Sequence, residues 1–322
     1  MPINIFSLLH SVILARALFV AADLNIAEHL ATKPMTISEL ATITQTHEPS
    51  LKRLVYFLEL NDVFKRSDEL CFNTEFSLTM CGDHPATIKP FLVHDDETRW
   101  NSFGNLGHSI KTGQASFDML YGKSYFDYLK DQPVLSSRFD QAMTIISAQE
   151  DNQIAQAMTF SGIVADIGGG KGQLLKNISQ YNSEVTQTVL FDLPATVQAV
   201  QDDSIITTKI GGSFFEPIDL KADVFILKRI LHDWDDEQAL DILKNVSASM
   251  SHNSKLYIID GILDQAQDKK LLAAIDLALL AIFKGKERTM QDINQLLEKA
   301  HLKIINITPI NDLISAIECK KI

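Results

Sequence analysis

The stretch Val164-Ala165-Asp166-Ile167-Gly168-Gly169-Gly170-Lys171-Gly172 runs from apolar residues through an acid into a glycine-rich turn. Apolar residues at helical spacing, Leu174, Leu175 and Ile178, follow it, so the sequence predicts a strand, a tight turn and a helix. Glycines let the backbone turn sharply and approach a ligand, which the N-terminal amides of the helix would face. The pattern is typical of a nucleotide-cofactor site, although such a turn is also an ordinary connection between a strand and a helix.

A second acidic residue is expected at the tip of the following strand. The apolar run 188–191 ends in Asp192, which Leu193 and Pro194 follow. A carboxylate there can bind ribose hydroxyls, which fits both NAD and S-adenosylmethionine. The spacing D-x-G-x-G-x-G, which begins at Asp166, differs from the G-x-G-x-x-G that accommodates a pyrophosphate. A cofactor without a pyrophosphate is therefore favoured.

From about residue 161 onward, apolar strand-like runs alternate with helical segments. The expected strands are 163–167, 187–191, 206–210, 223–227, 255–260, 302–307 and 313–318. This alternation predicts an α/β fold of the Rossmann type, with a mostly parallel, doubly wound sheet.

The N-terminal part of the chain has a different pattern. Apolar residues at helical spacing over 5–31 predict two helices. A capping box at Thr36-Ile37-Ser38-Glu39 predicts a short helix, and Pro49 lies in the first turn of another. The runs 63–66 and 70–72 predict a small hairpin. Helices followed by a hairpin indicate a winged-helix arrangement, which serves either for DNA binding or for dimerisation.

Charge argues against a nucleic-acid partner. The chain has 322 residues, which favours two domains, and its formal net charge is −12, which repels phosphate backbones and anionic membrane surfaces. The basic residues of the N-terminal part that could contact phosphates are Lys52, Arg53, Lys65 and Arg66. They alternate with acids and do not make a face of one sign, so neither nucleic acid nor a membrane is an expected partner.

The remaining composition points to a cytoplasmic protein. The three cysteines, Cys71, Cys81 and Cys319, are odd in number and lack CxxC spacing, which suits a reducing compartment and makes metal binding improbable. The first eighteen residues lack a basic start and a clear cleavage site, and Arg16 interrupts them. We expect an amphipathic first helix there.

A histidine follows the expected strand 223–227. His232 could deprotonate a substrate hydroxyl near neutral pH, and Asp233 or another acid could orient its imidazole. Functional groups of open α/β sheets gather at such carboxyl ends of strands, although a lone histidine is more often structural. Asp235 is expected to cap the next helix, so the neighbouring acids do not indicate a metal site.

Five motifs in this order resemble the plant-type family of small-molecule O-methyltransferases, which includes hydroxyindole O-methyltransferases and bacterial tailoring enzymes of secondary metabolism. They are Asp166-Ile-Gly-Gly-Gly-Lys-Gly172, Phe191-Asp-Leu-Pro194, Gly211-Gly-Ser-Phe-Phe215, Leu227-Lys-Arg-Ile-Leu-His-Asp-Trp234 and Gly285-Lys-Glu-Arg-Thr289. The resemblance spans nearly the whole chain. It implies an N-terminal winged-helix dimerisation domain, a Rossmann-like catalytic domain, and S-adenosylmethionine as methyl donor, which becomes S-adenosylhomocysteine without a metal.

The resemblance also implies roles for individual residues. The catalytic residues would be His232, Asp260 and Glu287. The cofactor would be bound by Asp166, Gly168, Gly169, Gly170, Asp192, Leu193, Ser213, Phe214, Lys228 and Ser147. The substrate pocket would include Met143 and Asp233. The density of aromatic residues in the segment 85–160 adds Trp100 and Phe103, although for any single aromatic there a place in a core is the favoured interpretation. Two positions depart from the family: Asp260 stands where the acid is usually Glu, and Ser213 stands where plant members have an acid.

The expected function is transfer of a methyl group to a phenolic or enolic hydroxyl of a small aromatic or polyketide-like acceptor, with His232 as the base. The expected domains are a dimerisation domain at 1–84, a helical linker and substrate-pocket segment at 85–160, and a catalytic domain at 161–322. The expected partner is a second copy in a homodimer. Alternatives are an N- or C-methyltransferase, a relative that uses the cofactor structurally, and a ligand-responsive winged-helix regulator.

Overall fold

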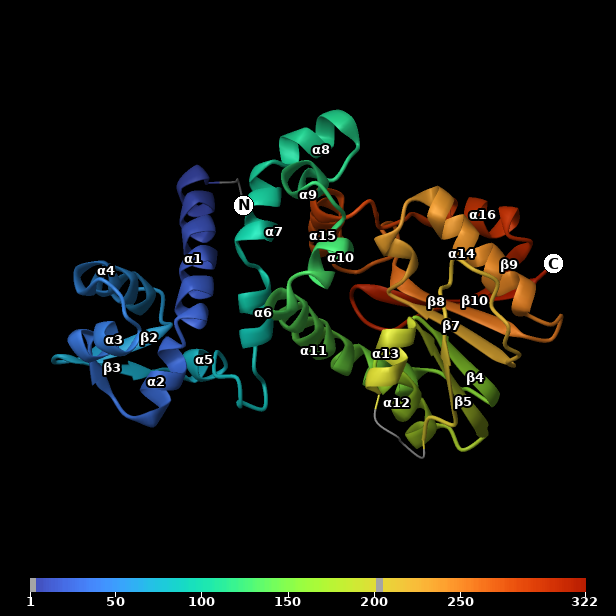
Figure 1. Ribbon diagram of the computed structural model, residues 1–322, viewed down its shortest axis with the longest axis horizontal. Helices are drawn as coiled ribbons and strands as arrows, with labels where there is room; N and C mark the ends of the chain where they lie inside the picture. Colours follow the sequence, from blue (N-terminus) through green and yellow to red (C-terminus); the bar gives the residue numbers. More distant parts are fainter. Residues whose placement is uncertain (1–3, 201–204) are drawn as a thin grey trace. The chain divides into compact units, whose positions relative to one another are not determined.

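The structure, a computed structural model, describes residues 4–200 and 205–322. The chain forms two compact units, which Figure 1 colours along the sequence. The first unit comprises the residues up to Trp100 together with Leu129–Ile145, and the second comprises Asn101–Tyr128 together with Ile146–Ile322. The segment 85–160 therefore contributes to both units.

The first unit contains helices and a small antiparallel sheet. Its elements before residue 95 are α1 (Ile5–Asp23), α2 (Ile26–Thr32), β1 (Met35–Thr36), α3 (Ile37–Ile43), α4 (Glu48–Glu59), β2 (Phe64–Ser67), β3 (Leu70–Asn73), α5 (Glu75–Leu78) and α6 (Lys89–His94). The predicted capping box is present at the start of α3, where the Glu39 N–H donates to Thr36 Oγ1 at 3.2 Å and the Thr36 N–H donates to Glu39 Oε2 at 2.7 Å. The predicted hairpin is β2 and β3, and the two-residue strand β1 adds a third strand in the order β1-β3-β2.

The expectation that α1 is amphipathic is wrong. Large apolar side chains are exposed along its first half, at Ile5, Phe6, Leu8, Leu9, Val12 and Ile13. Its buried residues, Ala17, Ala21 and Ala22, lie in the second half. Burial therefore changes along the helix rather than around it. Among the described residues, α1 is also the one helix long and apolar enough to cross a membrane, a property that buried helices of other proteins share.

The second unit contains a seven-stranded sheet in the order β6-β5-β4-β7-β8-β10-β9 (Figure 1). Its strands are β4 (Gly162–Ile167), β5 (Val185–Asp192), β6 (Thr208–Gly211), β7 (Val224–Lys228), β8 (Lys255–Gly261), β9 (Leu302–Pro309) and β10 (Ile314–Lys321). The first five are parallel, whereas β10 is antiparallel to both β8 and β9. Every strand expected from the sequence is present, which confirms the mostly parallel doubly wound fold.

Successive residues of the central strands point to opposite faces and build two cores. On one face, Phe225 and Leu227 pack with residues of α14 (Asp236–Ser249) and α16 (Met290–Lys299). On the other face, Val224 and Ile226 pack with residues of α12 (Gln173–Tyr181) and of α11 (Pro133–Ala157). Complete burial of one such side chain contributes about 1.5–3 kcal/mol. The two cores therefore hold the central strands, and the loops at their carboxyl ends, in fixed positions.

The described part of the chain contains further helices. They are α7 (Glu97–Gly104), α8 (Leu106–Thr112), α9 (Ser116–Tyr121), α10 (Tyr125–Lys130), α13 (Pro194–Ala199), α15 (Lys269–Ile282) and the 3₁₀ turn η1 (Leu231–Asp233). Aromatic side chains pack together in this part of the second unit, with ring centroids 4.6 Å apart for Phe117 and Tyr121, and 5.1 Å apart for Phe117 and Tyr125. Phe117 and Tyr125 are buried, so these two residues form a core of the second unit.

The order of the strands determines where a ligand can bind. From β4 the chain proceeds outward through β5 and β6, and it then returns to add β7 on the other side of β4. Loops at the carboxyl ends of β4 and β7 therefore diverge and leave a crevice, which is where open α/β sheets bind their ligands. The glycine-rich turn follows β4, and the segment with His232 follows β7.

Candidate active site

The glycine-rich turn after β4 has a backbone that favours glycine. Gly168, Gly170 and Gly172 have φ angles of +77°, +57° and +75°. The Gly168 N–H donates to the Phe191 carbonyl at 2.7 Å, which ties the turn to the end of β5. A Cβ at Gly169 would lie 2.5 Å from Asp166 Oδ2, so the turn packs directly over that carboxyl group.

Asp192, at the end of β5, holds the same turn. Its Oδ2 accepts a hydrogen bond from the Gly170 N–H at 2.8 Å, and its Oδ1 accepts one from the Leu193 N–H at 2.7 Å. Leu193 precedes α13, and its side chain is exposed. Burial raises the pKa of Asp192, while these backbone hydrogen bonds lower it. A carboxylate oxygen can accept more than one hydrogen bond, so Asp192 retains capacity for a ligand.

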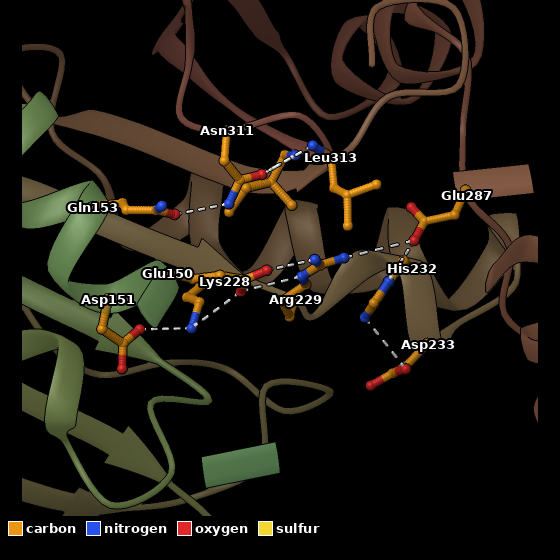
Figure 2. A network of polar contacts seen from close by, with 11 residues as sticks. Glu150, Asp151, Gln153, Lys228, Arg229, His232, Asp233, Glu287, Asn311 and Leu313 are labelled. Carbon is orange, nitrogen blue, oxygen red and sulfur yellow. Dashed lines mark hydrogen bonds and ion pairs between the residues drawn. The ribbon is translucent and has the colours of Figure 1, made fainter. Parts of the chain in front are cut away.

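Several carboxyl groups surround the turn. Burial, helped by the nearby charges of Asp151 and Asp192 and opposed by that of Lys228, raises the pKa of Asp166 to about 7. Lys228 is itself bound, because its Nζ lies 2.6 Å from Asp151 Oδ1 and 3.6 Å from Glu150 Oε2 (Figure 2). A positively charged ligand in this crevice would favour ionised carboxylates.

The remaining residues expected to bind the cofactor come from β6 and α11. Ser213 follows β6, and its Oγ accepts a hydrogen bond from the Phe215 N–H at 3.2 Å. The Phe214 ring packs against Phe215 and Trp234, with centroid distances of 5.0 and 6.0 Å. Ser147 lies half-buried on α11, in the second unit.

His232 lies in η1, directly after β7, beside Glu287 and Asp233, which are both among the predicted site residues. Its Nδ1 is 3.0 Å from Glu287 Oε1, and its Nε2 is 3.6 Å from Asp233 Oδ1 (Figure 2). The Glu287 side chain is fully buried. A hydrogen bond from Nδ1 to this carboxylate leaves the lone pair on Nε2, which is the arrangement of an oriented base.

Charge controls the protonation of this site. Burial lowers the pKa of His232, but the negative charges of Asp233, Asp260 and Glu287 outweigh burial and raise the pKa to about 9. Burial raises the pKa of Asp260 to about 7, and the positive charge of His232 opposes that shift. The imidazolium and the carboxylates therefore stabilise each other in the ligand-free protein.

Two carboxylate oxygens of the site are buried without a hydrogen-bond partner among the described residues, namely Asp260 Oδ1 and Glu287 Oε2. Asp260 and Glu287 both line a cavity of about 20 Å³, together with His232. That volume suits about one water molecule. Asp260 acts on His232 through its charge.

The loop that carries Glu287 is packed tightly against η1. A Cβ at Gly285 would lie 2.0 Å from the His232 carbonyl oxygen. Arg288 is buried and donates hydrogen bonds to the carbonyls of Leu231 at 2.6 Å and Trp234 at 2.8 Å. The Glu287 N–H, in turn, donates to Asp276 Oδ1 at 2.8 Å. These contacts hold the Glu287 carboxylate at the imidazole.

The residues expected to line the substrate pocket are distributed over both units. Asp233 and Phe103 belong to the second unit, whereas Trp100 and Met143 belong to the first. Within the first unit, the Trp100 ring lies 6.4 Å from that of Phe19, and the Arg16 guanidinium lies over it at 5.7 Å. Met143 is half-buried on α11.

Sequence reasoning did not assign roles to Glu150, Asp151 and Arg229, which the structure places beside Lys228 and Glu287 (Figure 2). Arg229 could have been noticed as a charged residue directly after a buried strand. The two acids are ordinary polar residues of a helix in the sequence, and nothing in their spacing links them to residues almost 80 positions away. Within the described ranges, no group of three or more His, Cys, Asp or Glu residues is arranged to hold a metal ion.

Comparison with known proteins gives the family. Residues 103–303 match the O-methyltransferase domain, and residues 6–83 match the O-methyltransferase dimerisation domain. A mitomycin biosynthesis 6-O-methyltransferase of Streptomyces lavendulae is 32% identical over 308 residues, which are 92% of this chain and 87% of the relative. The chain therefore belongs to the O-methyltransferase family, as the five motifs indicated.

Solved structures agree with this assignment. The structure of a mitomycin 7-O-methyltransferase has a TM-score of 0.91 at 29% identity, with 99% of this chain and 97% of that chain covered. An O-methyltransferase from neocarzinostatin biosynthesis, in complex with S-adenosylmethionine and 2-hydroxy-5-methyl naphthoic acid, has a TM-score of 0.84 at 28% identity, with 96% of each chain covered. The protein is an O-methyltransferase that uses S-adenosylmethionine, which confirms the expected cofactor.

Proposed function

We propose that this enzyme methylates a phenolic or enolic hydroxyl of a small aromatic or polyketide-like molecule, with His232 as the general base. The observation that carries the proposal is the 3.0 Å contact between His232 Nδ1 and the buried carboxylate of Glu287. The relatives support the acceptor class, since one is named for mitomycin biosynthesis and another was solved with a hydroxylated naphthoic acid. Family membership favours this enzyme over a winged-helix regulator.

The residues that would hold the cofactor fit a cationic ligand. The turn at Gly168, Gly169 and Gly170 leaves backbone free of side chains, and Asp166 and Asp192 supply negative charge at it. S-adenosylmethionine supplies a methyl group already activated on a positively charged sulfur. Ser213 offers a hydroxyl where plant members have an acid, so we propose that this end of the cofactor is bound without a charge.

The chemistry that remains for the protein is removal of the acceptor proton. With Nδ1–H held by Glu287, Nε2 of His232 takes the hydroxyl proton as the acceptor oxygen is methylated. The cofactor would supply the methyl group, and its carbon–sulfur bond would break to leave S-adenosylhomocysteine. The histidine is then an imidazolium, which Glu287, Asp233 and Asp260 stabilise. The Glu287 side chain is fully buried and that of His232 is largely buried, which limits competition from water.

The high pKa of His232, about 9, belongs to the protein without its cofactor. Positive charge in the same crevice disfavours the imidazolium. Binding of S-adenosylmethionine therefore lowers the pKa of His232 and increases the fraction of neutral imidazole, which can act as the base. We expect the rate at saturating cofactor to rise with pH and to level off below pH 9.

The test of the base is His232→Gln. The variant should lose about 10²–10⁴-fold in turnover, because general base catalysis contributes on that order. Its affinity for S-adenosylmethionine, measured by calorimetric titration, should stay close to that of the wild type. His252→Gln is the matched control, since His252 is exposed and lies outside the site. Unchanged turnover in a folded His232→Gln variant would mean that His232 is not the general base and that catalysis comes from alignment of the substrates.

We also propose that the protein works as a homodimer formed through the dimerisation domain, which would cover the exposed apolar residues of α1. The winged-helix description of residues 1–84, the functional division at 84 and 160, and a cytoplasmic location remain predictions of the sequence. Sedimentation of the purified protein tests the dimer directly.

A further inference from the structure

The residue after β7, Arg229, has an unusual backbone conformation. Its φ is +56°, in the left-handed region that residues other than glycine seldom adopt. Its N–H donates to the Ile259 carbonyl at 3.0 Å, so the conformation is fixed against the neighbouring strand. Such strain persists only when the surrounding structure imposes it, and it often marks functional sites.

The Arg229 side chain lies between two buried acids (Figure 2). Its Nη2 is 2.6 Å from Glu150 Oε1, and its Nη1 is 3.8 Å from Glu287 Oε1. The latter oxygen is the same one that lies 3.0 Å from His232 Nδ1. Arg229 and His232 therefore share one carboxylate oxygen, and Glu150 holds the other side of the guanidinium.

The other charges around His232 have their own arrangement. Asp233 from η1 and Asp260 from β8 act on the imidazole directly. Lys228 at the end of β7 is bound to Asp151 of α11. On the loop of Glu287, the cations Lys286 and Arg288 both pair with Asp236. Of the cations named here, Arg229 is the one whose ion pair includes the carboxylate that His232 uses.

We propose that Arg229 is a positioning residue that shares Glu287 with His232 and thereby weakens the stabilisation of the imidazolium by Glu287, and that Glu150 limits how strongly Arg229 does so. The catalytic part of this proposal rests on the proposed role of His232. Arg229 Nη1 and His232 Nδ1 lie no more than about 7 Å apart, since both contact one oxygen. At that separation, a unit charge shifts a pKa by roughly one to two units.

Removing the charge of Arg229 and removing that of Glu150 should change the pKa of His232 in opposite directions. Arg229→Met keeps the length of the side chain and removes its charge, so the charge of Glu287 acts on His232 without competition and the pKa of His232 rises. Glu150→Gln removes the charge that neutralises Arg229. Arg229 then interacts more strongly with Glu287, and the pKa of His232 falls. Arg229→Lys keeps the charge and should stay close to the wild type.

The experiment is an NMR titration of the ligand-free protein with isotope-labelled histidine rings, in which the His232 signal is identified by its loss in His232→Gln. We expect the pKa to rise by about one unit in Arg229→Met and to fall by a smaller amount in Glu150→Gln. Arg66→Met is the matched control, because Arg66 also pairs with a glutamate at 2.6 Å but lies in the first unit. It should leave the His232 signal unchanged.

The outcomes separate a positioning role from a structural one. Equal pKa values in wild type and Arg229→Met, or shifts of the same sign in Arg229→Met and Glu150→Gln, overturn the proposal. If Arg229→Met does not fold, the sign of the shift in Glu150→Gln alone decides. The titration needs no substrate, so its result is valid even if His232 proves not to be the base. The pH profile of turnover should shift together with the pKa of His232 only if both proposals are right.

Discussion

Asp166 is a buried carboxyl group whose charge depends on what lies beside it. With its pKa raised to about 7, the residue is partly protonated in the ligand-free protein near neutral pH. The unfolded chain ionises such a group near pH 4, so this shift lowers the free energy of unfolding as the pH rises from about 4 to about 7. The residue is thus better suited to the cofactor complex than to the free protein.

Binding of a cationic cofactor should lower the pKa of Asp166, so that its carboxyl group loses its proton. We expect the affinity for S-adenosylmethionine to increase as the pH rises from 6 toward 7, by at most about tenfold per unit, because the bound state favours the ionised carboxylate. Calorimetry at pH 7 in two buffers with different heats of ionisation should detect release of a proton on binding. Asp166→Asn should reduce that release, and the part that remains should come from His232, whose pKa the cofactor also lowers. Equal heats in both buffers for the wild-type protein would contradict the prediction.

At the scale of elements, the loop between α15 and α16 sets the distance between the base and its acid. Gly285→Ala should displace this loop, since its Cβ would lie 2.0 Å from the His232 carbonyl oxygen and 2.6 Å from the Asp233 carbonyl carbon, both of which are backbone atoms. We expect turnover to fall by at least about tenfold, because small misplacements of catalytic groups are costly. Cofactor affinity should change little.

The control for this variant is Gly107→Ala, on α8, where an added Cβ meets no atom within 4 Å. The rate and the pH profile of both variants should be measured on folded protein. A Gly285→Ala variant with the wild-type rate would show that the loop relaxes without moving Glu287.

Elements and site were not equally predictable. The strands could be predicted because each one is an apolar run bounded by turn residues, and the helix at Thr36 because its cap is local. The contact of His232 with Glu287 joins residues 55 positions apart, and only the family resemblance suggested it. The bonds from Arg229 to Glu150 and Glu287 depend on the left-handed turn after β7 and on the position of α11, neither of which has a local signal.

At the scale of the whole molecule, the exposed apolar half of α1 is the surface that the proposed dimer would cover. The side chains of Phe6 and Leu9 are 78% and 61% exposed, and both lie in the dimerisation match. We expect Phe6→Asp with Leu9→Asp to convert a dimer into monomers, because a buried unpaired charge is strongly unfavourable at an interface. Light scattering coupled to gel filtration measures the mass.

The control for the α1 variant is Ile305→Asp, which places one such negative charge at a half-exposed apolar residue of β9 in the second unit. It should leave the mass unchanged. Persistence of the dimer in the α1 variant would move the interface elsewhere in the first unit.

The helix α11 limits how this enzyme can be cut or recombined. Its first half is counted with the first unit, but its later residues Glu150 and Asp151 neutralise Lys228 and Arg229 in the second. A catalytic fragment that begins at the first strand of the large sheet would leave the partly buried Lys228 without Glu150 and Asp151, and Arg229 without Glu150. Chimaeras that exchange acceptor specificity between relatives should therefore take α11 and the segment after β7 from the same parent protein.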